Sequence, residues 1–261
     1  MSLSIAEESF LYDSLSGPQR LRPDGRLPHQ FRPVEVFTDF LPSSDGSSRV
    51  IASDGSECIV SVKCKVVDHT VEPDLIQVDV DIAGERDDSL LVESIASLLN
   101  KLIGTVDHAR LQLTKKYSFK IFIDVLVLSS FSYPISLISF GVYFAVSATQ
   151  LPKLVSNFDD LEVEELPMFD DYDLVPLEMR TPLVFTLALV GKNVFLDPAA
   201  NESAVANNGL VVSWSAGTVV APLRTIALNN THVTGFDPEL LQVGIKLVEQ
   251  HAPGIVHALE G

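Results

Sequence analysis

The sequence has little positive charge for its length. Its 261 residues hold 18 Lys and Arg against 35 Asp and Glu, so the formal net charge is −17. Such acidity argues against a free-standing nucleic-acid binder, which usually has a basic balance. Hydrophobic residues make up 46% of the chain and charged residues 20%. The chain can therefore form a sizeable core, and general disorder is not expected.

Cysteine is also scarce. The two cysteines, Cys58 and Cys64, lie in a segment whose pattern is that of one strand. Strand geometry puts their backbones roughly 20 Å apart, far beyond the ~7 Å limit for a disulfide. The acidic N-terminus shows no signal-peptide pattern. We therefore expect two free thiols in a reducing compartment.

One long stretch, 125–151, carries no charge at all. It is long enough in principle to span a membrane. Serines interrupt it, however, and no cationic anchors flank it. We expect a buried strand, a polar loop and then a helix that opens near Pro134, with no membrane partner.

The pattern of apolar residues predicts an α+β fold. A short helix is expected over 3–15, with Ile5, Ser9 and Tyr12 facing inward and Gly17-Pro18 ending it. The other expected helices cover 88–103, 134–150 and 238–259, the last one kinked or interrupted at Pro253. The expected strands are 34–40, 49–53, 57–67, 76–83, 119–128, 183–190, 193–196, 210–215 and 219–227.

This element order suggests two related modules, each with helices packed on one face of a mixed sheet. An N-terminal helix and arginine-bearing arm (1–32) precede the first module (33–150). An acidic linker (151–182) leads to the second module (183–261).

Most searches for catalytic motifs find nothing. The sequence has no G-x-S-x-G elbow, no Walker loop and no G-x-G-x-x-G, and its six histidines are scattered. Asp79 and Asp81 lie on one face of a strand, as Lys63 and Lys65 do on an earlier one. Cross-strand ion pairing explains both pairs better than an acid–base site does.

Two segments of the chain are basic although the chain as a whole is acidic. The first holds Arg20, Arg22, Arg26 and Arg32, and the second holds Arg110, Lys115, Lys116 and Lys120. Either segment could bind phosphates. Ordinary solvated surface, or a docking edge for an acidic neighbour, is the alternative. The candidate RNA contacts are Arg20, Arg22, Arg26, Arg110, Lys115 and Lys116.

Four segments carry a resemblance to a known family. They are "RPDGR" at 22–26, "FLPSSDGSSRVIASDGSECIVSVKCKVVD" at 40–68, "FDDLEVEELPMFDDYD" at 158–173 and "LDPAANESAVANNGLVVSWS" at 196–215. With them the chain resembles the RNase PH family, and specifically the ring subunits of the eukaryotic RNA exosome.

The resemblance implies an RNase PH-like fold of two βαβα-type modules. It also implies a ring of six paralogous subunits, capped by RNA-binding proteins, with RNA threading the central channel towards an associated hydrolytic exoribonuclease. The implied setting is the nucleus and nucleolus, and also the cytoplasm.

Active members of the family hold phosphate with a Gly-Gly-Thr-Arg type sequence at the start of a helix. Glycine lets the backbone come close to the phosphate, the N–H groups at the start of the helix donate hydrogen bonds to it, and arginine balances its negative charge. The corresponding segment here, "VLVLSSFSYPISL" at 125–137, has neither glycine nor arginine. Pro134 also removes one N–H from the start of the helix.

Active members also carry two aspartates six positions apart, for acid catalysis and metal binding. Asp197 matches the first, but Ser203 stands at the second position and Glu202 one position early. Asp197-Pro198 is better interpreted as a turn. We therefore expect no catalytic residue, no metal and no cofactor.

The predicted function is that of a non-catalytic structural subunit of the exosome ring. It would help to form the channel that guides RNA for 3′–5′ processing and degradation, including ribosomal RNA processing. The alternative is a phosphorolytic 3′–5′ exoribonuclease subunit whose active site is completed at a ring interface. An independent RNA-binding module is a third and weaker option, given the charge of −17.

Overall fold

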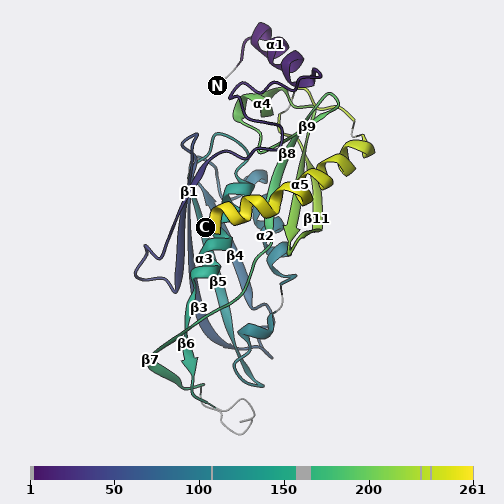
Figure 1. Cartoon of the computed structure of the whole chain (residues 1–261). Helices are drawn as coiled ribbons and strands as arrows, with labels where there is room; N and C mark the ends of the chain where they lie inside the picture. Colours follow the sequence, from purple (N-terminus) through teal and green to yellow (C-terminus); the bar gives the residue numbers. More distant parts are fainter. Residues whose placement is uncertain (1–2, 107, 157–165, 230, 236, 261) are drawn as a thin grey trace.

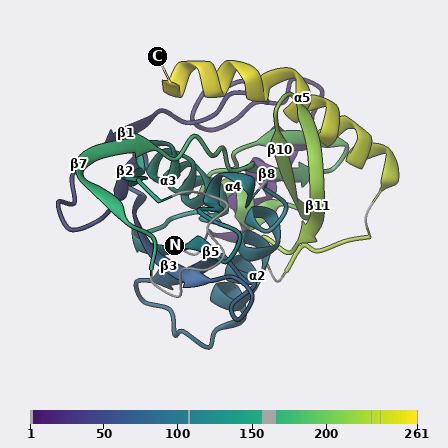
Figure 2. The same cartoon turned by 90° about the horizontal axis from the view of Figure 1, so that it is seen from below.

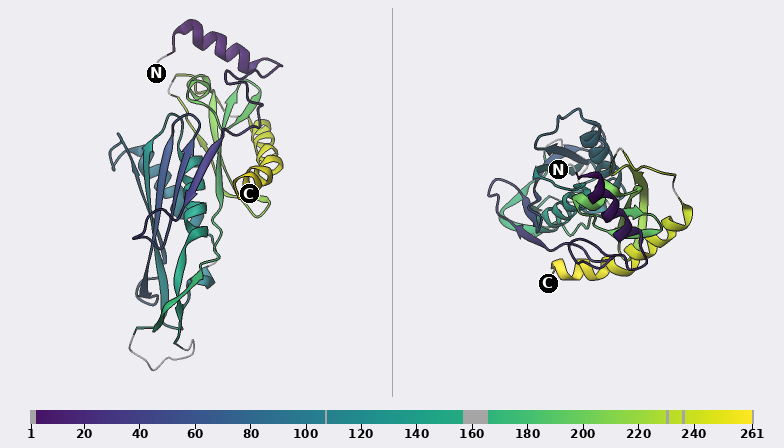
Figure 3. Two further views of the ribbon diagram at one scale, coloured as in Figure 1. Left: turned by 60° about the vertical axis from the view of Figure 1, so that its left-hand side comes forward. Right: turned by 90° about the horizontal axis from the view of Figure 1, so that it is seen from above.

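A computed structural model describes residues 3–106, 108–156, 166–229, 231–235 and 237–260. Two sheets lie one above the other in Figure 1, with α1 at one end of the molecule and the β6–β7 hairpin at the other (Figure 3). In chain order the elements are α1 (Ile5–Ser16), β1 (Val34–Thr38), β2 (Gly46–Ala52), β3 (Glu57–Asp68), β4 (Ile76–Ile82), α2 (Leu90–Ile103), a 3-10 turn η1 (His108–Leu111), β5 (Tyr117–Ser129), α3 (Ile135–Ala148), β6 (Gln150–Leu154), β7 (Phe169–Pro176), β8 (Leu183–Val190), β9 (Asn193–Leu196), α4 (Ala200–Val205), β10 (Asn208–Ser215), β11 (Thr218–Ile226) and α5 (Pro238–Glu260).

The first sheet has the strand order β1-β2-β3-β5-β4 and is mixed, because β4 and β5 run parallel with α2 as their crossover. The second sheet has the order β11-β10-β8-β9. It is antiparallel throughout, since hairpins and the short α4 join its strands. The α+β, RNase PH-like class predicted from the sequence is confirmed.

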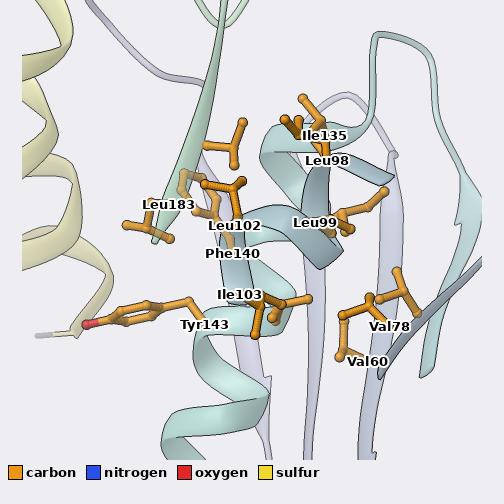
Figure 4. Close-up of a cluster of buried hydrophobic side chains, with 14 of the residues drawn as sticks. Val60, Val78, Leu98, Leu99, Leu102, Ile103, Ile135, Phe140, Tyr143 and Leu183 are labelled. Carbon is orange, nitrogen blue, oxygen red and sulfur yellow. The ribbon is translucent and has the colours of Figure 1, made fainter. Parts of the chain in front are cut away.

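The uncharged stretch forms the centre of the molecule. Helix α3 contacts β2 and β3 of the first sheet and β8 of the second. Its side chains are buried on nearly all sides, which explains why the sequence shows no polar face. One apolar core therefore joins α2, α3 and both sheets, and Figure 4 shows part of it. Among the described residues, no helix combines the length and apolar character needed to cross a membrane.

Two sequence-based expectations about the helices need correction, and one helix was missed. Ile5 does not face inward: its exposed fraction is 87%, and α1 packs instead through Leu11 and Leu15, which lie one turn apart. Pro253 does not interrupt α5, because it lies on the exposed side, where the carbonyl it leaves unbonded can face water. Helix α4 was not predicted, since six residues are too few to show a helical period.

The predicted linker is not plain coil. Strands β6 and β7 pair within 151–182 and form a two-stranded sheet. Phe169 of β7 stacks on Phe119 of β5 with ring centroids 5.6 Å apart, so the hairpin is attached to the first module. The acidic residues at 157–165 lie outside the described part of the chain.

The predicted ion pairing of Lys63 and Lys65 with Asp79 and Asp81 is wrong. Both aspartates do lie on the exposed face of β4. However, β5 separates β3 from β4 in the sheet, so the lysines and aspartates are not cross-strand neighbours. The order of strands in a sheet is not visible in the alternation of residues along each strand.

Both cysteines lie in β3 as free thiols, as predicted. Burial raises the pKa of each thiol to about 12, and the nearby carboxylates Glu57 and Asp45 add to the shift at Cys58 and Cys64 respectively. Only the thiolate is a good nucleophile. We therefore expect neither cysteine to react with a disulfide reagent at pH 8 within minutes, and both to react once the chain is unfolded in urea. Rapid labelling of the folded protein would contradict this assignment.

Candidate active site and candidate RNA contacts

Asp197 lies directly after β9, in the left-handed backbone region with φ of +51°. It is 4% exposed, and its carboxylate accepts hydrogen bonds from the arginine-bearing arm. Arg32 donates from its backbone N at 2.8 Å and from Nη2 at 2.7 Å. Arg26 Nη1 donates at 2.8 Å. The carboxylate of Asp197 therefore holds the arm against the second module.

Glu202 and Arg22 form a second, fully buried ion pair. Both side chains have 0% exposure, and the guanidinium donates from Nε to Oε1 at 2.8 Å and from Nη2 to Oε2 at 2.7 Å. The other guanidinium hydrogens go to backbone carbonyls, including those of Leu196 and Asp197. Because this pairing is bidentate and complete, the Glu202 carboxylate is held by a cation of the same chain.

A small cavity lies beside the segment 125–137, for which the sequence predicts no phosphate site. Its volume is about 20 Å³, and Ser130, Ser132, Pro134, Arg32 and Asp197 contribute to its lining. A cavity of this size holds about one water molecule. Pro134 caps α3 without any side-chain hydrogen bond. A phosphate group therefore finds no room here, although the start of α3 is not capped by a side chain.

Arg32 is the cation that lines this cavity, and it is already neutralised. Burial acts to lower its pKa, but hydrogen bonds to Asp197 and the charge of Asp54 together raise that pKa above its usual value. Asp54 sits in the Asp-Gly turn between β2 and β3 and pairs with Nη1 of Arg32. The charge of Arg32 is thus balanced within the chain by two carboxylates.

The candidate RNA contacts divide into two groups. Arg22 is buried and paired with Glu202, so its assignment as an RNA contact is withdrawn. The Arg26 side chain is 10% exposed and bound to Asp24 and Asp197. The second group consists of Arg20, Arg110 and Lys115, which are exposed, and Lys116, which is half-buried. Within it, Arg110 pairs with Glu178 at 3.1 Å and Lys116 lies 3.9 Å from Asp68.

The structure brings together residues that the sequence did not connect. Arg22, Arg26 and Arg32 converge on Asp197 and Glu202 from the opposite end of the chain. The "RPDGR" segment was the available signal, since two of these arginines belong to it. Within the described part of the chain, no group of three or more His, Cys, Asp or Glu residues is arranged to hold a metal ion.

A histidine pair joins the arm to the C-terminal helix. The rings of His29 and His251 stack with centroids 4.1 Å apart, in a groove that Arg32 also lines. Figure 2 shows α5 running along the outside of the second sheet towards the arm. Burial and the neighbouring His29 lower the pKa of His251 below 6.5. The stack therefore contributes stability above pH 6.5, and this contribution is lost as the pH falls and the ring becomes charged.

We expect a matching pH dependence of thermal stability. Replacing His251 with phenylalanine keeps a ring against His29 but removes the titration. The melting temperature of the wild-type chain relative to that of His251→Phe should fall between pH 7.5 and pH 5.5. A difference that stays constant over this range would show that the pair does not titrate as described.

The chain is similar to known proteins over its full length. No family model matches the chain. The chain is 66% identical over 263 residues to the protein named exosome complex component RRP42 of Saccharomyces cerevisiae, covering 100% of this chain and 99% of that protein. It is 28% identical over 252 residues to the component of the same name from Schizosaccharomyces pombe, covering 87% and 83%.

Solved structures share the fold at low identity. A chain of an archaeal exosome core superposes with a TM-score of 0.75 at 19% identity, covering 98% of this chain and 97% of that one. A chain of the Archaeoglobus fulgidus exosome with RNA bound to the active site gives 0.74 at 18% identity, covering 97% of each. At these identities the likeness concerns the fold alone.

Proposed function

Since the chain belongs to the RRP42 family of exosome complex components, we propose that it is a non-catalytic structural subunit of an exosome core ring. It contributes interfaces and part of the channel wall that guides RNA 3′ ends during processing and degradation. Its proposed partners are paralogous ring subunits, RNA-binding caps and an associated hydrolytic exoribonuclease. Its proposed locations are the nucleus, the nucleolus and the cytoplasm.

The non-catalytic assignment rests on the hydrogen bonds that the carboxylates of Asp197 and Glu202 already accept. Asp197 and Glu202 are bound by Arg22, Arg26 and Arg32 of the same chain. A metal ion needs a carboxylate with a free lone pair, and a general acid needs a carboxyl group that can carry a proton facing the substrate. Here these oxygens face arginines in the interior, and the adjoining cavity has room for about one water molecule.

Two measurements test the proposal. Native mass spectrometry of the tagged chain, purified from its own cells at moderate salt, should give a particle with several related subunits and caps. A free monomer or homo-oligomer would contradict the ring assignment. The purified chain should also release no nucleoside diphosphates from RNA in the presence of phosphate and Mg²⁺.

An activity assay on the assembled particle distinguishes the non-catalytic ring subunit from the phosphorolytic alternative. Phosphate-dependent release by the particle, abolished by Asp197→Asn in this chain, would assign catalysis to an interface that includes this subunit. Four residues at the surface, Arg20, Arg110, Lys115 and Lys116, are the proposed RNA contacts. Their replacement by glutamine should weaken RNA binding by the particle without changing its subunit composition.

A further inference from the structure

The outer face of the first sheet, which no helix covers in the described part of the chain, bears a group of lysines around one aromatic ring. Lys63 and Lys65 point outward from β3 and are exposed. Lys65 lies directly opposite Lys120 of β5, and Lys63 lies opposite Phe122. The ammonium groups of Lys65 and Lys120 lie 5.2 Å and 5.4 Å from the centre of the Phe122 ring.

This arrangement is unfavourable for the isolated fold. Like charges on directly opposed residues of neighbouring strands repel each other. The Phe122 ring offsets part of that repulsion through cation–π contacts. Lys120 also pairs with Glu72 at 2.9 Å. Among the residues described, no carboxylate is recorded within 4 Å of Lys63 or Lys65, so their charges are left for a ligand outside the chain.

The lysines form a line. Lys115 and Lys116 lie in the turn before β5, where the N–H groups of Leu113 and Thr114 bond back to Tyr117, so further positive charge lies at the end of the strand beyond Lys120. From Lys63, which lies opposite Phe122, to the start of β5 at Tyr117 the distance is roughly 17 Å at the rise of a strand. The line occupies the end of β3 and β5 that lies away from α1 and α4 (Figure 1). These five lysines are a large share of the 18 Lys and Arg in a chain with a net charge of −17.

We propose that this lysine line, together with Phe122, binds the phosphate backbone of single-stranded RNA. The inference rests on the proposed function, which places RNA within reach of the chain. A linear row of ammonium groups matches a linear polyanion better than a compact acidic patch on a protein. Lysine binds phosphate as a point charge, and an aromatic ring on a strand offers a face on which a base can stack in place of one ammonium group.

The test is RNA binding by the purified particle, or by the full chain if no particle forms. The probe is a fluorescent single-stranded oligonucleotide, titrated at several salt concentrations. When the logarithm of the binding constant is plotted against the logarithm of the salt concentration, each phosphate contact of single-stranded RNA contributes about 0.7 to the steepness of the slope. The double variant Lys63→Gln/Lys65→Gln should therefore reduce that steepness by about 1.4. Phe122→Leu should weaken binding about fivefold or more at an unchanged slope, because the ring is uncharged.

The matched control is Lys192→Gln/Lys246→Gln, which removes the same charge from exposed positions of the second module. It should leave the slope unchanged. An unchanged slope for Lys63→Gln/Lys65→Gln in an intact particle overturns the proposal. Loss of subunits from the particle without a change in slope also overturns it, and assigns the face to a protein partner. Native mass spectrometry of the wild-type chain tests the ring assignment separately, so the two failures are distinguishable.

Discussion

Replacing Glu202 with alanine should lower the free energy of unfolding by about 3–5 kcal/mol, the range observed when one partner of a buried ion pair is removed. The guanidinium of Arg22 stays behind with no exposed surface and no countercharge. Glu202 also accepts from the backbone N of Ala199 at 2.8 Å at the start of α4, and this bond is lost as well. Urea unfolding followed by tryptophan fluorescence measures the change.

A second variant shows whether charge is the cause. In Arg22→Met/Glu202→Ala both charges are absent, so the double variant should be more stable than Glu202→Ala alone. The control is Asp88→Ala, which breaks an exposed pair whose side chains are 85% and 67% accessible. It should leave stability almost unchanged. A loss of less than about 1 kcal/mol for Glu202→Ala would show that this pair is not the buried contact described here.

The buried pair of Arg22 and Glu202 joins two distant parts of the chain. Arginines of the arm hold the carboxylates of Asp197 and Glu202 in the interior. Arg22 and Glu202 are separated by 180 positions and meet at 2.8 Å. Their substitution therefore affects the attachment of the arm to the second module, and through it the stability of the whole chain.

Sequence patterns predicted the regular elements well where they are long. The strands of the first sheet and the helices α2 and α3 fall within a few residues of their expected positions, because alternation and helical periodicity are strong over such lengths. Ser89 and Gly104 cap α2, as residues of these types often do. The β6–β7 hairpin was missed, because acidic residues dominate its segment and hide the alternation.

The candidate site was only partly predictable for a physical reason. The sequence alone shows that the segment before and around Pro134 contains neither glycine nor arginine. The partners of Asp197 and Glu202 are not visible there, because long-range pairing depends on how the arm crosses the second module. Arg22 was therefore assigned to the surface, although it is buried. The same limit produced the wrong pairing of Lys63 and Lys65 with acids of a strand that is not adjacent.

The packing of α3 against β2 leads to the second large expected effect. Gly46 opens β2 where the end of α3 lies closest to it. A Cβ atom at this position would lie 2.5 Å from the carbonyl oxygen of Ala145 and 2.8 Å from the Cα of Thr149. Both are backbone atoms, so no rotation of a side chain can relieve the overlap. We expect Gly46→Ala to lower the free energy of unfolding by about 3 kcal/mol, at the upper end of the usual cost of overpacking.

Gly254 provides the matched control. It lies in α5, and a Cβ built there meets no atom within 4 Å. Gly254→Ala should raise stability by about 0.5–1 kcal/mol, since alanine favours the helix more than glycine does. Opposite signs for the same chemical change, measured by urea unfolding, would support close contact between α3 and β2. If Gly46→Ala were as harmless as the control, α3 could not be held between the two sheets as tightly as described, and the shared core of the two modules would need another explanation.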